Sequence, residues 1–126
     1  MKFEIKQHFN IESARFLPHL PPEHPCAQMH GHSFKIILRI HSGLDGNVGW
    51  VMDYNEISKR VAPILALIDH KVLNNVPGLE NPTSEFLAFW LYRQIREVLP
   101  DLVQISVAET PQTECSFPAL MSTTEV

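Results

Sequence analysis

Hydrophobic and polar residues alternate along several segments of the chain, which is the pattern of strands with one buried face. In residues 3–12 the apolar side chains fall mainly on odd positions, and in residues 32–41 they fall on even positions. Residues 103–109 alternate in the same way. We therefore expect strands over these three segments. A further short strand is expected over residues 48–52, after a turn formed by residues 42–47.

Two other segments repeat their apolar residues at helical spacing. The first begins after Asp53, with Glu56 three residues further on as in a capping box, and its apolar pattern reaches Ile68. The second begins after Thr83, a suitable N-cap, and ends before Pro100. Its predicted apolar stripe consists of Phe86, Trp90 and Leu91. Strands on either side of a helical pair predict an α+β fold, a mainly antiparallel sheet with both helices on one face.

Length and charge restrict what such a chain can do. The 126 residues are enough for one domain, which we place at residues 1–120, followed by a polar tail at residues 121–126. The net charge of −4 and the absence of a long Lys/Arg run argue against nucleic acid as a partner. No apolar stretch approaches the roughly 20 residues that span a bilayer, and the first residues do not form a signal-peptide pattern. We therefore expect no membrane partner and a cytoplasmic location.

Two histidines and a cysteine are the first candidates for chemistry. His30 and His32 are two residues apart on a predicted strand, so both imidazoles point to the same face. Catalytic zinc usually takes three protein ligands and one open position, and this pair could supply two of them. They could equally be hydrogen-bonded histidines of a loop. Cys26 lies four residues earlier and could act as a thiolate base, a nucleophile or a metal ligand.

Carboxylates supply the remaining candidates. Asp69 is followed directly by His70, a pair that could relay protons or could simply cap the first helix. Glu109 continues the apolar face of the last predicted strand, where a carboxylate is buried only if it has a partner. That partner could be an Arg or Lys of the fold, or the donor edge of an amino-heterocycle such as a guanine or pterin ring. Alternatively, Glu109 faces water at the strand end.

Five segments combine into a more specific signal. They are Cys26-x-x-x-His30-Gly31-His32-Ser33-Phe34, Gly49-Trp50-Val51-Met52-Asp53-Tyr54, Asp69-His70-x-x-Leu73-Asn74, Asn81-Pro82-Thr83-Ser84-Glu85 and Glu109-Thr110. In order and spacing the chain resembles the 6-pyruvoyltetrahydropterin synthase / 6-carboxytetrahydropterin synthase family from about Phe9 to Phe117. The segment at residues 78–83 is most similar to the bacterial 6-carboxytetrahydropterin synthases.

The resemblance implies a fold, an assembly and a reaction. The fold is the tunnelling fold, or T-fold, assembled as a homohexamer of two trimers with active sites between subunits. The substrate is 7,8-dihydroneopterin triphosphate, converted to 6-carboxytetrahydropterin with release of acetaldehyde and triphosphate in the synthesis of 7-deazaguanine and queuosine precursors. A 6-pyruvoyltetrahydropterin synthase reaction is the alternative.

The resemblance also implies a role for each candidate residue. One zinc ion per subunit, bound by His30 and His32, would polarise the substrate side chain. Cys26 would act as general base, while Asp69 and His70 would relay protons across the subunit boundary. Glu109 would anchor the pterin ring.

One position departs from the family pattern. Where the family has a histidine as third zinc ligand, this chain has Arg15, whose guanidinium has no lone pair to donate and stays protonated. Arg15 shares the odd-numbered face of Phe9 and Ile11, where a lone cation would need a partner. Three explanations are open. First, His19, His24 or Cys26 could complete the zinc site. Second, the guanidinium could stand in for the charge of the metal. Third, the protein could be a divergent relative that binds a pterin or purine with weak or no turnover.

Overall fold

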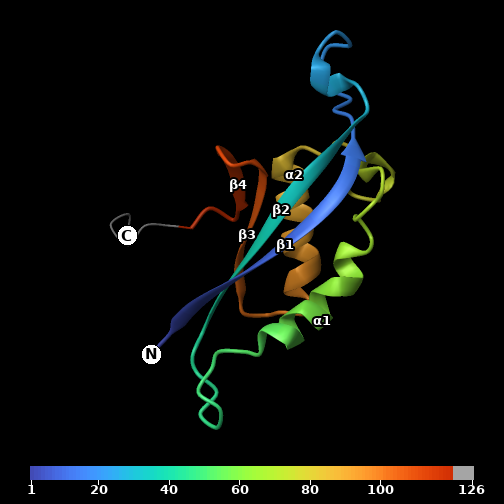
Figure 1. Cartoon of the computed structure of the whole chain (residues 1–126). Helices are drawn as coiled ribbons and strands as arrows, with labels where there is room; N and C mark the ends of the chain where they lie inside the picture. The colour runs from blue at the N-terminus through green and yellow to red at the C-terminus, as the bar shows by residue number, and fades with distance from the viewer. Residues whose placement is uncertain (121–126) are drawn as a thin grey trace.

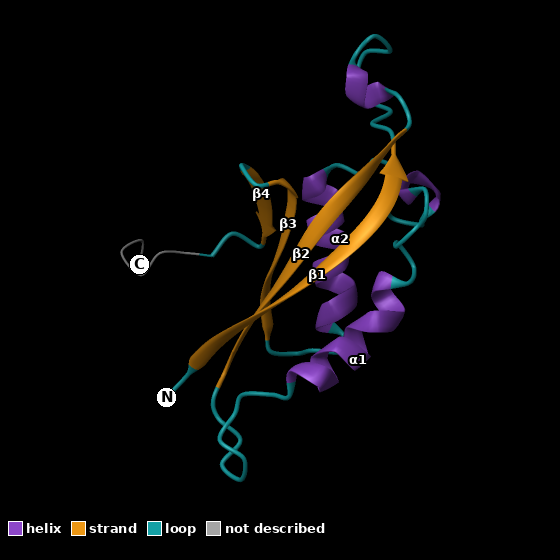
Figure 2. Ribbon diagram, in the orientation of Figure 1, coloured by secondary structure: helices purple, strands orange, loops and turns teal. Residues whose placement is uncertain are grey.

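The computed structural model describes residues 1–120, so the predicted polar tail at residues 121–126 lies outside the described residues. A four-stranded antiparallel sheet forms one layer, with the strands side by side in chain order (Figures 1 and 2). Its strands are β1 (Phe3–Arg15), β2 (His30–Ser42), β3 (Leu102–Thr110) and β4 (Thr113–Phe117). Both helices, α1 (Tyr54–Leu65) and α2 (Ser84–Arg96), cover the same face of this sheet. The predicted α+β architecture is confirmed.

The register of the sheet decides which side chains share the covered face. Ile11 on β1 lies opposite Phe34 on β2, and directly paired residues of antiparallel strands project to the same side. Both are fully buried and belong to one core cluster with the helices. Continuing the same parity toward the end of β1 places Ser13 opposite His32 and Arg15 opposite His30. The face that forms the core therefore carries polar residues at this end.

The helices begin where the sequence predicts them, because each has a side-chain cap. The Asp53 carboxylate accepts a hydrogen bond from the backbone N–H of Asn55, and the Thr83 hydroxyl accepts one from Phe86. The buried residues of α1 are Ile57, Val61 and Ile64, and those of α2 are Leu87, Ala88, Trp90, Leu91 and Ile95. No helix within residues 1–120 is long and apolar enough to cross a membrane.

Several predicted details were wrong. Residues 48–52 form no strand, because Asp45 closes a turn with Trp50 and Gly49 reverses the chain at a positive φ of 79°. Helix α1 ends at Leu65, and Ile68 is buried from the turns that follow. Phe86, predicted in the buried stripe of α2, is 50% exposed, since its neighbour Leu87 takes the inward position.

The fourth strand was missed by the sequence pattern. It was not predicted because β4 is short and its inward positions are Cys115 and Phe117, too few for a clear alternation. A tight reversal at residues 111–112 joins it to β3, and Thr110 pairs with Thr113 across that turn. The sheet consequently ends in β4 rather than in the predicted strand before α1.

The connection after α1 runs along the outer edge of β1 and closes it near the polar end of the sheet. The backbone N–H of His70 donates to the carbonyl of Glu12 (2.6 Å), and Ala14 donates to the carbonyl of Lys71 (2.9 Å). Further on, the Asn74 side chain accepts from the N–H of Phe16 (3.0 Å) and donates to its carbonyl (2.8 Å). This connection holds Asp69 and His70 beside β1.

We predict that Asn74→Ala lowers the free energy of unfolding by about 1–3 kcal/mol, because it removes both partners of the Phe16 backbone. The matched control is the exposed neighbour Asn75, whose change to Ala should cost less than about 0.5 kcal/mol. Urea denaturation of the two variants measures both values. Equal losses would show that Asn74 does not hold the edge of β1.

Candidate functional site

Arg15 ends β1 on the covered face of the sheet and is only 4% exposed. Its Nη2 forms an ion pair with Oε1 of Glu109, and its Nη1 donates to the Pro82 carbonyl at 3.0 Å. The guanidinium carbon lies 4.9 Å from the centre of the Phe34 ring, a cation–π contact. Arg15 therefore reaches from β1 across β2 to β3. The expectation that a cation at this place needs a partner is confirmed.

Glu109 is the partner, at the point where β3 leaves the core. Its Oε1 accepts hydrogen bonds from Arg15 and from the hydroxyl of Ser84 (2.5 Å). Ser84 is the first residue of α2. Of the alternatives left open for this carboxylate, an arginine of the fold is the one observed. Within residues 1–120 no hydrogen bond is found to Oε2, and the Glu109 side chain keeps 26% of its surface exposed.

The ionisation of Glu109 follows from these neighbours. Burial by itself would raise the pKa of this carboxyl group, but the hydrogen bonds from Ser84 and Arg15 and the charge of Arg15 outweigh it. The pKa is lowered below its ordinary value, so Glu109 is a carboxylate at neutral pH. A fixed, ionised acceptor is what an amino-heterocycle with several N–H donors requires.

His30 and His32 lie on the same face as Arg15, as predicted from their spacing, with ring centres 6.4 Å apart. The Nδ1 atom of His30 is bonded to the Gln28 carbonyl (2.8 Å) and that of His32 to the Ser33 carbonyl (2.9 Å). A carbonyl can only accept, so each Nδ1 carries a proton, and in the neutral imidazole the lone pair is then on Nε2. Metal-binding histidines commonly have this arrangement.

The remaining candidates for a third metal ligand are not brought to this pair. His19, His24 and Cys26 belong to the loop between β1 and β2, which projects away from the body of the molecule (Figure 1). There the Nδ1 of His24 accepts from the backbone N–H of Cys26 (3.0 Å) and caps η1 (Pro25–Ala27). In the part of the chain that the structure describes, no three His, Cys, Asp or Glu side chains gather as a metal site.

Asp69 and His70 form a separate pair beside β1. The Asp69 carboxylate lies 3.0 Å from Nδ1 of His70 and accepts from the backbone N–H of Glu12 at 2.9 Å. The His70 backbone has a positive φ of 58°, a region that few residues other than glycine adopt. Its side chain is 77% exposed. Within residues 1–120, neither residue is hydrogen-bonded to Cys26 or Glu109.

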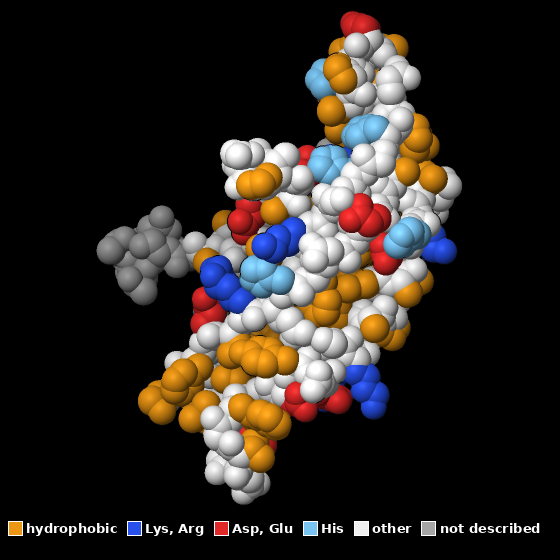
Figure 3. Space-filling view, in the orientation of Figure 1, with side chains coloured by type: hydrophobic (Ala, Val, Ile, Leu, Met, Phe, Trp, Pro, Cys, Tyr) orange, Lys and Arg blue, Asp and Glu red, His pale blue; other side chains and the backbone are white. Residues whose placement is uncertain are grey.

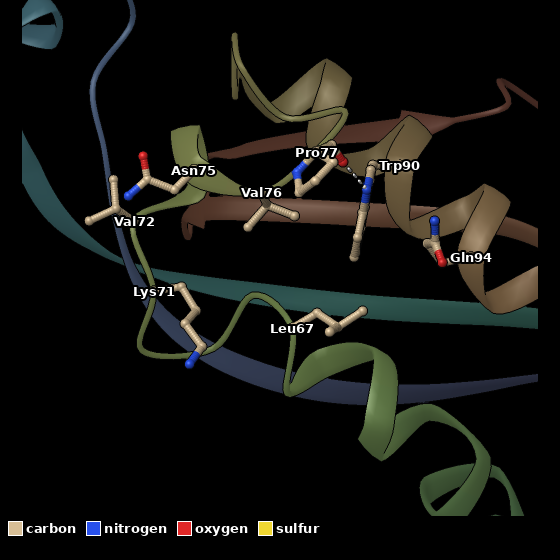
Figure 4. A pocket seen from close by; sticks show the side chains of 8 residues that line it. All are labelled: Leu67, Lys71, Val72, Asn75, Val76, Pro77, Trp90 and Gln94. Atoms are coloured by element: carbon tan, nitrogen blue, oxygen red, sulfur yellow. Dashed lines mark hydrogen bonds between the residues drawn. The ribbon is translucent and has the colours of Figure 1, made fainter.

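Two surface hollows are lined by candidate residues, and a third lies away from them. An open hollow of about 540 Å³ is lined by His32 and His70, one residue of each pair. A smaller one of about 130 Å³ is lined by Glu109, Ser84 and the β4 residues 113–115. A third, of about 480 Å³, lies between the end of α1, the connection after it and Trp90 (Figure 4). No predicted site residue lines this third hollow.

The sequence prediction missed the residues that hold the ion pair. In the sequence, Ser84, Pro82 and Phe34 stand out only as members of the matched segments. Ser84 is 25 positions from Glu109, Pro82 is 67 positions from Arg15, and the ion pair itself spans 94 positions, so no local pattern reveals these contacts. The parity of Arg15 on β1 was the one available signal.

Comparison with known proteins places this arrangement in a family. The model of the 6-pyruvoyl tetrahydropterin synthase family matches residues 4–119. A 6-carboxy-5,6,7,8-tetrahydropterin synthase of Synechocystis sp. is 35% identical over 112 residues, which cover 84% of this chain and 85% of the relative. A dihydroneopterin monophosphate aldolase of Pyrococcus furiosus is 32% identical over 78 residues, 62% of this chain and 65% of the relative.

A solved structure shares this fold. The solved structure of Caenorhabditis elegans 6-pyruvoyl tetrahydropterin synthase superimposes with a TM-score of 0.86 at 20% identity, covering 95% of this chain and 97% of that one. The architecture is thus that of a T-fold protein. The chain belongs to the 6-pyruvoyl tetrahydropterin synthase family. The resemblance inferred from the five sequence segments is confirmed.

We predict that Glu109→Ala lowers the free energy of unfolding at pH 7 by about 3 kcal/mol, because it leaves the buried guanidinium of Arg15 without its counter-charge. Glu114→Ala, an exposed carboxylate on β4, should cost less than about 0.5 kcal/mol. Chemical denaturation measures both. A loss at Glu109 no larger than at Glu114 would contradict the role of the ion pair.

The same pair predicts a pH dependence. Because the folded pKa of Glu109 is lowered, its ionisation stabilises the protein above the unfolded pKa of about 4.5 and this contribution is lost as pH falls through the folded pKa. The wild type should therefore exceed Glu109→Gln in stability at pH 7, and the difference should narrow below about pH 4.5. A difference that is constant with pH would contradict this assignment.

Proposed function

We propose that the protein is a lyase of the 6-carboxytetrahydropterin synthase type. It converts 7,8-dihydroneopterin triphosphate to 6-carboxytetrahydropterin, with release of acetaldehyde and triphosphate, as a step toward 7-deazaguanine and queuosine precursors. The name and 35% identity of the Synechocystis relative support this reaction. A 6-pyruvoyl product is the alternative, and the aldolase name of the Pyrococcus relative indicates that reactions differ within the family.

The observation that carries the proposal is the fixed carboxylate of Glu109. A pterin ring presents a row of N–H donors on its pyrimidine edge, and a carboxylate held in place accepts two of them at once. Arg15 and Ser84 hold Oε1, while Oε2 and the hollow beside it are left for a ligand. Glu109 would thus bind and orient the ring, so that the side chain of the substrate reaches the proton-transferring residues.

Proton transfer is proposed for Cys26, Asp69 and His70. Cys26 would take a proton from the substrate side chain, and the Asp69–His70 pair, already joined at 3.0 Å, would hold and return it. Within one chain Cys26 belongs to the projecting loop, whereas His70 lies at the outer edge of β1. We therefore propose that the complete site combines Cys26 of one subunit with Asp69 and His70 of another.

An assembly of this kind suits the surface of the chain. β4 and the part of β1 before Glu12 are uncovered edges of the described sheet, and open edges pair readily with another copy. Exposed apolar side chains also gather at the end that holds the N-terminus and the turn before α1 (Figure 3), including Phe3, Val48 and Trp50. A homohexamer of two trimers in the cytoplasm is the proposed form.

Zinc is left out of this proposal. A bound zinc ion would polarise the substrate oxygens, and His30 and His32 each keep an Nε2 lone pair for it. Arg15, however, takes the third position and is itself a cation. The donor set therefore does not fit a three-ligand zinc site, and no step is assigned to the metal.

A second candidate function is pterin or purine binding without turnover. Arg15 favours it, because a family site that has exchanged a metal ligand for an arginine could keep ring recognition and lose the reaction. The two candidates differ in whether product forms.

We predict that the purified protein releases acetaldehyde and 6-carboxytetrahydropterin from 7,8-dihydroneopterin triphosphate. Cys26→Ala should lose at least about 100-fold in kcat, the usual range for a proton-transferring group. Glu23→Ala, exposed in the same loop, is the control and should match the wild type. Liquid chromatography with mass detection measures the products. Binding of the pterin without any product in the wild type would establish the second candidate instead.

Sharing of the site between subunits has its own readout within this assay. His70→Asn keeps a residue that tolerates the positive φ at this position and removes the imidazole. Each single variant should be inactive, and dissociated and reassembled mixtures of Cys26→Ala with His70→Asn should recover part of the activity. No recovery in mixed oligomers would contradict a shared site.

A further inference from the structure

Arg15 stands at the sequence position where the family pattern has a third zinc-binding histidine. The pairing of β1 with β2 sets Arg15 directly opposite His30, on the face that also holds His32. Both imidazoles keep a lone pair at Nε2. A guanidinium offers no lone pair and repels a divalent cation, so its presence opposes metal binding by this pair.

Arg15 is not free to turn away from this position. The side chain is more than nine-tenths buried and is held at three points: the Glu109 carboxylate, the Pro82 carbonyl and the Phe34 ring. Turning it outward would leave Glu109 without its charged partner beside the core. Among the described residues, the Arg15 Nε is buried without a hydrogen-bond partner. The hydrogen bonds to Glu109 and Pro82 therefore leave further N–H donors of the guanidinium unused.

We propose that Arg15 is a positioning residue that replaces the zinc ion as the fixed positive charge of this site, so that the protein recognises a pterin ring without metal. The ring-binding part rests on the proposed function. Arg15 acts through Glu109: it fixes the orientation of the carboxylate and keeps one oxygen engaged. The ligand class is an amino-heterocycle with adjacent N–H donors, as in the 2-amino-4-oxopyrimidine edge of a pterin.

Zinc stoichiometry tests the first part without reference to turnover. The oligomer is incubated with excess zinc, desalted and analysed for metal per chain. The wild type should retain far less than one zinc per chain, and Arg15→His, which completes a three-histidine set, should retain about one. Arg96→His, on the exposed side of α2, is the matched control and should remain at the wild-type level.

Ring affinity tests the second part, with neopterin as a fluorescent probe in two buffers, one containing EDTA and one containing added zinc. The wild type should bind neopterin equally well with EDTA and with added zinc. Arg15→Lys keeps the charge and should stay within a few-fold of that affinity, whereas Arg15→Gln should lose at least about tenfold. A merely structural role would predict that Lys and Gln behave alike.

Two results would overturn the proposal. One is a wild-type protein that retains one zinc per chain through His30 and His32. The other is neopterin binding that appears only when zinc is added. Neopterin binding in EDTA without turnover of the triphosphate would instead remove the proposed lyase reaction and leave the role of Arg15 in place.

Discussion

The ion pair between Arg15 and Glu109 is the contact on which the arrangement of the site depends. It joins strands that are not neighbours, because β2 lies between β1 and β3 and the guanidinium passes over the Phe34 ring. Through Pro82 and Ser84 the same pair also fixes the chain before α2 and the first turn of that helix. The elements β1, β3 and α2 therefore meet at the buried charge of Arg15. This buried charge is stable only while all of its partners stay in place.

The same contact fixes the chemistry that the site can offer. Glu109 stays ionised because a cation and a hydroxyl group face it, and it is presented at the edge of the core. The Nδ1 atoms of His30 and His32 are engaged by backbone carbonyls, and Arg15, a cation, lies opposite His30 across the strand pair. Family membership thus accounts for the fold. The change at residue 15 alters how the positive charge of the site is supplied.

Much of this fold follows from local patterns. The alternation in β1 and β2, the caps at Asp53 and Thr83 and the shared face of the histidine pair were predicted from sequence and are observed. The errors lie where the pattern is short. Val48 and Val51 look like a strand but belong to a turn, and β4 has two inward residues only.

The site is harder to predict than the fold, because its contacts are long-range. Arg15 was known to need a partner and Glu109 was known to need one, yet their meeting depends on a register that spans three strands. The spatial relation of Cys26 to Asp69 and His70 was expected from the resemblance. It was expected to combine residues of two subunits, and it stays a prediction.

X-ray diffraction from crystals grown with zinc, recorded above and below the zinc absorption edge, tests the central claim most directly. We predict that the Arg15 guanidinium is paired with the Glu109 carboxylate and that no full-occupancy anomalous peak lies between His30 and His32. A strong peak held by three protein ligands, with Arg15 turned away from Glu109, would contradict it.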